Sequence, residues 1–297
     1  MYCSAVVFSR ISQLSAGSQD GELLDSLAAC CTPLSPVSFY TVTTSGGSSR
    51  SKLLEGREQL ERAWIRSTTS ELHLSSQAVG SRADTEPFAW AWLSRDVGSF
   101  LPGSERGSRR TATIHRTLEV AETDGLLRGL QELFSLLDAQ SGYIHLSSDR
   151  VLALGEADFQ TMIALRPEET LGPTGTFDPG GGRNSLHWKH PEDTNDRIRQ
   201  LGQVRSLVGP RLRGTYWGTF VGREMVEELG GMQRVMREAP VHRVEAVGHS
   251  GLYLQLTRSP EPITAPAMKK GLLDLEHYLQ PVLVPLPPYF AARENGK

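Results

Sequence analysis

Hydrophobic and polar positions alternate along much of the first 150 residues, and this pattern predicts short strands interrupted by amphipathic helices. Alternating or β-branched runs predict strands at residues 2–11, 37–43, 71–78, 88–93, 111–120 and 142–146. Apolar residues at helical spacing predict helices at 20–31, 52–66 and 125–139. Runs rich in Gly and Ser predict loops at 45–51 and 94–110.

The best-specified stretch covers residues 213–258, where every local signal agrees. It predicts a strand at 215–221, a helix at 224–239, and strands at 242–247 and 252–257 joined by a Gly-His-Ser-Gly turn. A helix at 266–279 and a short strand at 282–286 follow. Within the first helix, Gly230 and Gly231 predict a weak point or a bend.

The resulting order, β-α-β-β-α-β, is the ferredoxin-like arrangement. A similar order with one more strand precedes it in the chain. We therefore predict an α+β fold of two ferredoxin-like halves with antiparallel sheets, packed as one unit. The predicted boundaries are residues 1–150 for the N-terminal half, 151–212 for an irregular Gly/Pro-rich connection, and 213–297 for the C-terminal half. No sequence repeat supports a duplication.

Composition narrows the class of protein. The 297 residues carry a net charge of -3, which argues against a concentrated basic surface for nucleic acid. The chain has three cysteines and no Cys-x-x-Cys, so we expect buried thiols in a reducing compartment. The first residues lack a basic region typical of a signal peptide, and no apolar run approaches the ~20 residues of a membrane span. These features predict a cytoplasmic protein that does not enter a membrane.

The sequence contains no recognisable catalytic motif. It lacks the G-x-S-x-G elbow of hydrolases, and its Gly180–Gly182 run does not have the spacing of a phosphate loop. His187 and His190 could bind zinc in a metal-dependent hydrolase, but Pro191 favours a loop and no third ligand is evident. We expect His115 and His145 to be structural strand residues. The prediction is therefore a protein that is not an enzyme and needs no cofactor.

The segment from 166 to 196 is rich in Gly and Pro and shows no periodicity, which is unusual inside a compact protein and indicates function or disorder. Its carboxylates are either a solvated surface or an acidic loop that meets a basic patch on another protein. The predicted binding residues of this segment are Glu168, Glu169, Asp178, Trp188, Glu192, Asp193 and Asp196.

Three segments carry a family resemblance: TYWGTFVGREMVEELGG at 215–231, HRVEAVGHSGLYLQLTRSPE at 242–261, and LLRGLQELFSLLDAQSGYIHLS at 126–147. With the FAWAWL run at 88–93, the chain resembles the type VI secretion immunity proteins (TsiV-like), formerly grouped only as a domain of unknown function. The resemblance implies a cytoplasmic antitoxin that binds a cognate effector toxin and occludes it stoichiometrically. A basic nuclease is one candidate for this toxin. A self-associating structural module is the remaining alternative.

Overall fold

The computed structural model describes residues 1–11, 20–31, 38–44, 47–64, 69–76, 88–96, 108–148, 211–212, 214–262 and 265–283. The strands are β1 (Tyr2–Ile11), β2 (Phe39–Thr44), β3 (Ser49–Leu53), β4 (Thr69–Ser75), β5 (Ala89–Asp96), β6 (Ser108–Thr117), β7 (Ala139–Ser147), β8 (Gly218–Val221), β9 (Arg243–Val247) and β10 (Gly251–Gln255). The helices are α1 (Asp20–Ala29), α2 (Arg57–Trp64), α3 (Thr123–Leu136), α8 (Arg223–Glu228), α9 (Met232–Glu238) and α10 (Pro266–Leu279), with short 3₁₀ turns η1 (Val120–Glu122) and η2 (Gln280–Val282).

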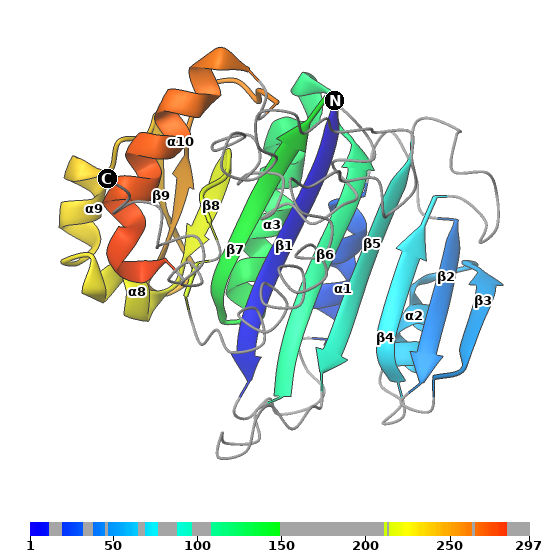
Figure 1. The fold of residues 1–297 in the computed structure, drawn as a ribbon. Helices are drawn as coiled ribbons and strands as arrows, with labels where there is room; N and C mark the ends of the chain where they lie inside the picture. Colours follow the sequence, from blue (N-terminus) through cyan, green and yellow to red (C-terminus); the bar gives the residue numbers. More distant parts are fainter. Residues whose placement is uncertain are drawn as a thin grey trace, which may run out of the picture.

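The described strands form one ten-stranded sheet in the order β3-β2-β4-β5-β6-β1-β7-β8-β10-β9 (Figure 1). Every pairing between neighbouring strands is antiparallel. Helices and strands are therefore combined around an antiparallel sheet, and the predicted α+β class is confirmed. The strands from both parts of the chain share this single sheet, because β7 pairs with β8.

Alternation along the strands gives the sheet two faces of different character. In the central strand β1, Cys3, Ala5 and Val7 are fully buried in the main hydrophobic core. Successive residues of a strand point to opposite faces of the sheet, so Ser4 lies on the other face. Its cross-strand partners there are His115 on β6 and His145 on β7. One face is thus apolar, and the other carries hydroxyl, imidazole and aromatic groups.

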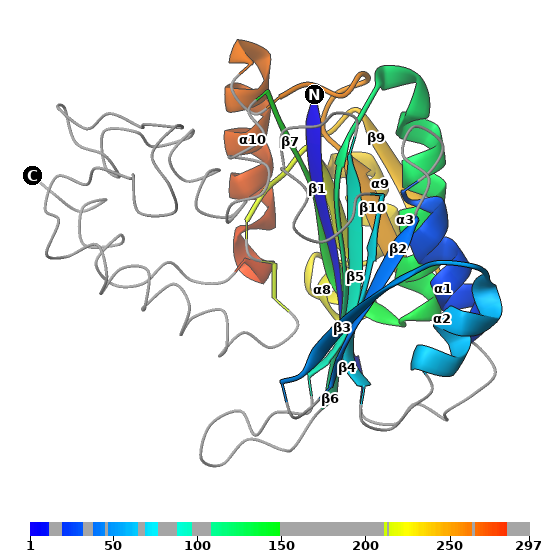
Figure 2. The same ribbon diagram turned by 90° about the vertical axis from the view of Figure 1, so that its right-hand side faces the viewer.

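Helices cover the two faces unequally. Figure 2 shows α1, α2 and α3 on one side of the sheet and α10 on the other. The apolar stripe of α3, including Leu126, Leu130 and Leu133, is buried against the core. Helices α1 and α3 approach closely at Gly129, where an added Cβ would lie 2.7 Å from the sulfur of Cys30. Glycine is therefore needed at that contact.

The C-terminal part shows the split βαβ order, since β10 lies between β8 and β9. The other neighbour of β8 is β7. Strand β7 therefore occupies the position in which the fourth strand of a ferredoxin-like fold pairs. At this junction the amide of Gly222 donates a hydrogen bond to the carbonyl of Gln140 at 2.8 Å. The description of the chain as two ferredoxin-like halves, and the boundaries at 150 and 212, remain predictions.

Four local predictions need correction. The helix expected at 224–239 is two helices, because Gly230 and Gly231 adopt φ values of 95° and 92°, outside the helical region. The weak point predicted at these two glycines is confirmed. The loop expected at 45–51 includes the start of β3, and the helix expected from residue 52 begins at Arg57. The strand expected at 282–286 is, as far as it is described, the end of η2 and one parallel bridge between Leu212 and Leu283.

Two other predictions are confirmed, the buried cysteines and the helix at 266–279. Cys3, Cys30 and Cys31 are free thiols buried in the core. The helix predicted at 266–279 has those bounds. Within the described residues, no helix combines the length and apolarity that crossing a bilayer requires.

Candidate protein-binding groove

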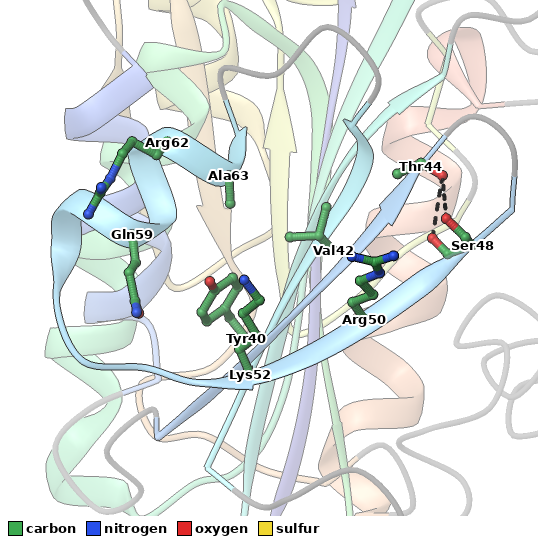
Figure 3. A pocket seen from close by; sticks show the side chains of 9 residues that line it. All are labelled: Tyr40, Val42, Thr44, Ser48, Arg50, Lys52, Gln59, Arg62 and Ala63. Carbon is green, nitrogen blue, oxygen red and sulfur yellow. Dashed lines mark hydrogen bonds between the residues drawn. The ribbon is translucent and has the colours of Figure 1, made fainter.

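A groove of about 460 Å³ lies between α2 and the β2–β3 hairpin, at the end of the sheet (Figure 3). Its buried floor includes Tyr40 and Ala63, with the half-buried Val42 beside them. Its rim is polar and basic. The remaining lining residues are Thr44, Ser48, Arg50, Lys52, Gln59 and Arg62. We refer to this site as the β3 groove.

The hairpin that forms one wall follows from its local sequence. Thr44 and Ser48 close it, because the Thr44 amide donates to the Ser48 carbonyl at 3.0 Å and their hydroxyls lie 2.9 Å apart. Gly47 supplies the φ of 78° that the turn requires. One hydrogen bond between the hydroxyls of Thr41 and Ser51, at 2.7 Å, holds the two strands together on the face opposite α2.

Helix α2 forms the opposite wall and is anchored by its apolar side. Trp64 is fully buried, and its indole N–H donates to the carboxylate of Asp20 at 3.3 Å. The hydroxyl of Thr69, at the start of β4, donates to the carbonyl of Ala63 at 2.7 Å. The helix is therefore held at both the α1 side and the sheet side, and the groove has two supported walls.

The groove carries positive charge. In the described part of the chain, neither Arg50 nor Lys52 forms an ion pair, and both are exposed. Arg62 lies 4.0 Å from Glu58, but its side chain is 72% exposed, so this ion pair is weak. Arg50 and Lys52 are two residues apart on β3, so their side chains lie on the same face of the sheet. With Tyr40 and Val42 they face α2. The site can therefore attract an anionic group.

Strand β3 ends the sheet, so one of its edges has no paired strand among the described residues. Hydrogen bonds at both ends of the hairpin, from Thr44 to Ser48 and from Leu54 to Ser38, fix which backbone groups face β2. By alternation, Arg50 and Lys52 direct their N–H and C=O groups toward β2, whereas Ser49, Ser51 and Leu53 direct theirs outward. The outer edge therefore offers a row of backbone donors and acceptors.

A second group of polar residues lies on the α10 side of the sheet. The rings of Trp92 and His115 lie 4.9 Å apart, and those of Tyr143 and Tyr216 stack at 4.2 Å. Burial, and secondly the nearby His145, lower the pKa of His115 to about 4. This imidazole is neutral at pH 7, and its structural role stays a prediction.

The predicted binding residues Glu168, Glu169, Asp178, Trp188, Glu192, Asp193 and Asp196 lie outside the described residues, as do His187 and His190. Within the described part, no three or more His, Cys, Asp or Glu side chains group as metal ligands. Sequence reasoning missed the β3 groove because the run Ser49–Leu53 was assigned to a loop and a helix. Its serine–cation alternation was the available signal.

Comparison with known proteins gives a structural likeness but no sequence match. The chain matches no protein-family model and no curated protein. It is similar in structure to a solved protein described as the Pseudomonas aeruginosa T6SS protein PA0821, with a TM-score of 0.58 and 12% sequence identity. The match covers 95% of this chain and 73% of the other. At this identity the likeness shows a shared fold, one that occurs in a type VI secretion protein.

Proposed function

We propose that this protein is an immunity protein of a type VI secretion system, which binds a cognate effector toxin and neutralises it by stoichiometric occlusion. The observation that carries the proposal is the structural likeness to a T6SS protein over 95% of the chain. The sequence resemblance to type VI immunity proteins points in the same direction. The structural likeness concerns nearly the whole chain rather than one short motif.

The proposal describes a protein that binds and does not catalyse. An inhibitor of this kind needs a rigid scaffold and an accessible recognition surface. The ten-stranded sheet supplies the scaffold, and the β3 groove is an accessible surface at its end. Action in the cytoplasm and a nuclease as the toxin are parts of the proposal drawn from the resemblance.

The test is co-expression with the type VI effector encoded beside the gene. We expect the purified pair to elute as one complex with a fixed stoichiometry, and cells that express both proteins to survive the toxin. A matched control is an unrelated effector, which should neither bind nor be neutralised. Absence of both binding and protection with the adjacent effector would contradict the proposal.

A further inference from the structure

We propose that the outer edge of β3 receives an extended acidic segment of the toxin, which adds to the sheet as an eleventh, antiparallel strand. The inference rests on the proposed function, since it assigns a recognition mode to the toxin. It combines two observations of the β3 groove: an unpaired sheet edge, and two cations beside that edge without ion-pair partners in the described part of the chain.

The backbone geometry defines the register of the added strand. Ser49, Ser51 and Leu53 present outward N–H and C=O groups, so residues opposite them exchange backbone hydrogen bonds with β3. Residues opposite Arg50 and Lys52 then form non-hydrogen-bonded pairs with β3. In such pairs the Cα atoms are only about 4.5 Å apart and the side chains lie close together. Those partner side chains lie on the α2 face of the sheet, where the groove is.

The charges define the chemistry of the segment. Cross-strand pairs of opposite charge are stabilising, and like charges destabilise. An Asp or Glu opposite Arg50 and another opposite Lys52 would lie two residues apart in the partner, as acid-x-acid. The exposed cation Arg62 on the opposite wall adds to the positive electrostatic potential of the groove. The apolar floor at Tyr40 and Val42 accommodates the methylene groups of these side chains.

An antiparallel partner strand agrees with the rest of the sheet, in which every neighbouring pair runs antiparallel. Cations on an edge strand also serve to prevent self-association. The two roles differ in their consequences: a recognition edge loses its partner when the cations are reversed, whereas a protected edge pairs with a second copy. The experiment therefore measures both toxin affinity and oligomeric state.

The probe is the type VI effector encoded beside the gene, titrated against purified full-length variants. Arg50→Glu/Lys52→Glu should raise the Kd about tenfold or more, and the wild-type Kd should rise with salt. The matched control Arg223→Glu/Lys270→Glu makes the same charge change at exposed sites on α8 and α10 and should alter the Kd less than about twofold.

A backbone variant tests strand addition without changing charge. Ser51→Pro removes an outward N–H but none that faces β2, so an added strand loses a hydrogen bond. It also loses the hydroxyl contact with Thr41, so Ser51→Ala, which loses only that contact, is the matched control. We expect weaker toxin binding than in Ser51→Ala at a similar unfolding midpoint. Thermal unfolding of each variant separates a loss of binding from a loss of folding.

The outcomes are distinct. If wild type binds and protects but both β3 variants bind equally well, the edge inference is wrong and the immunity function stands. If Arg50→Glu/Lys52→Glu self-associates and keeps its toxin affinity, the cations protect the edge, which also overturns the inference. If wild type neither binds the effector nor protects, the proposed function itself fails. A Glu192→Lys/Asp193→Lys variant that alone loses affinity would assign recognition to the acidic segment instead.

Discussion

Arg116 and Glu122 form an ion pair inside the protein, with Nη2 2.6 Å from Oε2 and side-chain exposures of only 1% and 7%. Arg116 also donates to the carbonyl oxygens of Cys30 at 2.8 Å and of Thr117 at 2.9 Å. The guanidinium thus connects β6, the end of α1 and the η1 turn that precedes α3. A buried pair contributes less by attraction than its loss would cost, because removing one charge leaves the other unpaired.

Glu122→Gln should therefore lower the free energy of unfolding by about 3 kcal/mol, measured by urea denaturation at pH 7. The control is Glu227→Gln, which breaks an exposed ion pair with Arg223 and should cost less than about 1 kcal/mol. Equal losses in the two variants would contradict a special role for the buried pair.

His115 should make stability depend on pH. Its pKa is about 4 in the folded protein, lowered mainly by burial, against 6.5 for an ordinary histidine. Between these values the unfolded chain binds more protons, so this contribution is fully present above pH 6.5 and is lost as the pH falls toward 4. We expect a loss of about 2 kcal/mol between pH 7.5 and pH 5 from this residue.

The measurement is the urea unfolding free energy at both pH values. His115→Phe keeps an aromatic ring beside Trp92 and removes the titrating group, so its stability should change less with pH. His249→Gln, an exposed change in the β9–β10 turn, should leave the wild-type slope intact. A slope that is unchanged in His115→Phe would show that other groups cause the dependence.

Gly231→Ala should destabilise the protein by about 1–3 kcal/mol through backbone strain alone. Gly231 has φ 92° and ψ 162°, yet nothing lies within 4 Å of an added Cβ. Gly125, in α3, also has open space there and no positive φ. Gly125→Ala should therefore be neutral or stabilising by up to about 1 kcal/mol. Thermal or urea unfolding distinguishes the two, and similar effects would refute the strain argument.

The three cysteines should resist thiol reagents in the folded state. Burial raises the pKa of Cys3 and of Cys31 to about 12 and that of Cys30 well above its usual value. The thiolate that reacts is therefore scarce, and the sulfur is inaccessible. A colourimetric thiol assay at pH 8 should show negligible rapid reaction without denaturant and three thiols per chain in urea. Rapid labelling of a native thiol would contradict this.

Local patterns predicted most elements but not how they end. Residues 266–279 carry helical periodicity and a Pro at the start, and α10 has those bounds. The pattern at 224–239 was also helical, but two glycines with positive φ divide it. Periodicity reports which face is apolar, whereas a break depends on backbone angles that periodicity does not reveal. Strand β3 escaped prediction because all five of its residues are exposed, so hydrophobic alternation was absent.

The sequence alone determined the α+β class and the buried thiols, since these depend on composition and local periodicity. Only the tertiary structure decided that β7 and β8 join both parts of the chain in one sheet, and that β3 ends it. Pairing between distant strands depends on packing and register, which no local window contains. The β3 groove exists for the same reason: α2 and a polar edge strand acquire a shared surface only when the sheet is assembled.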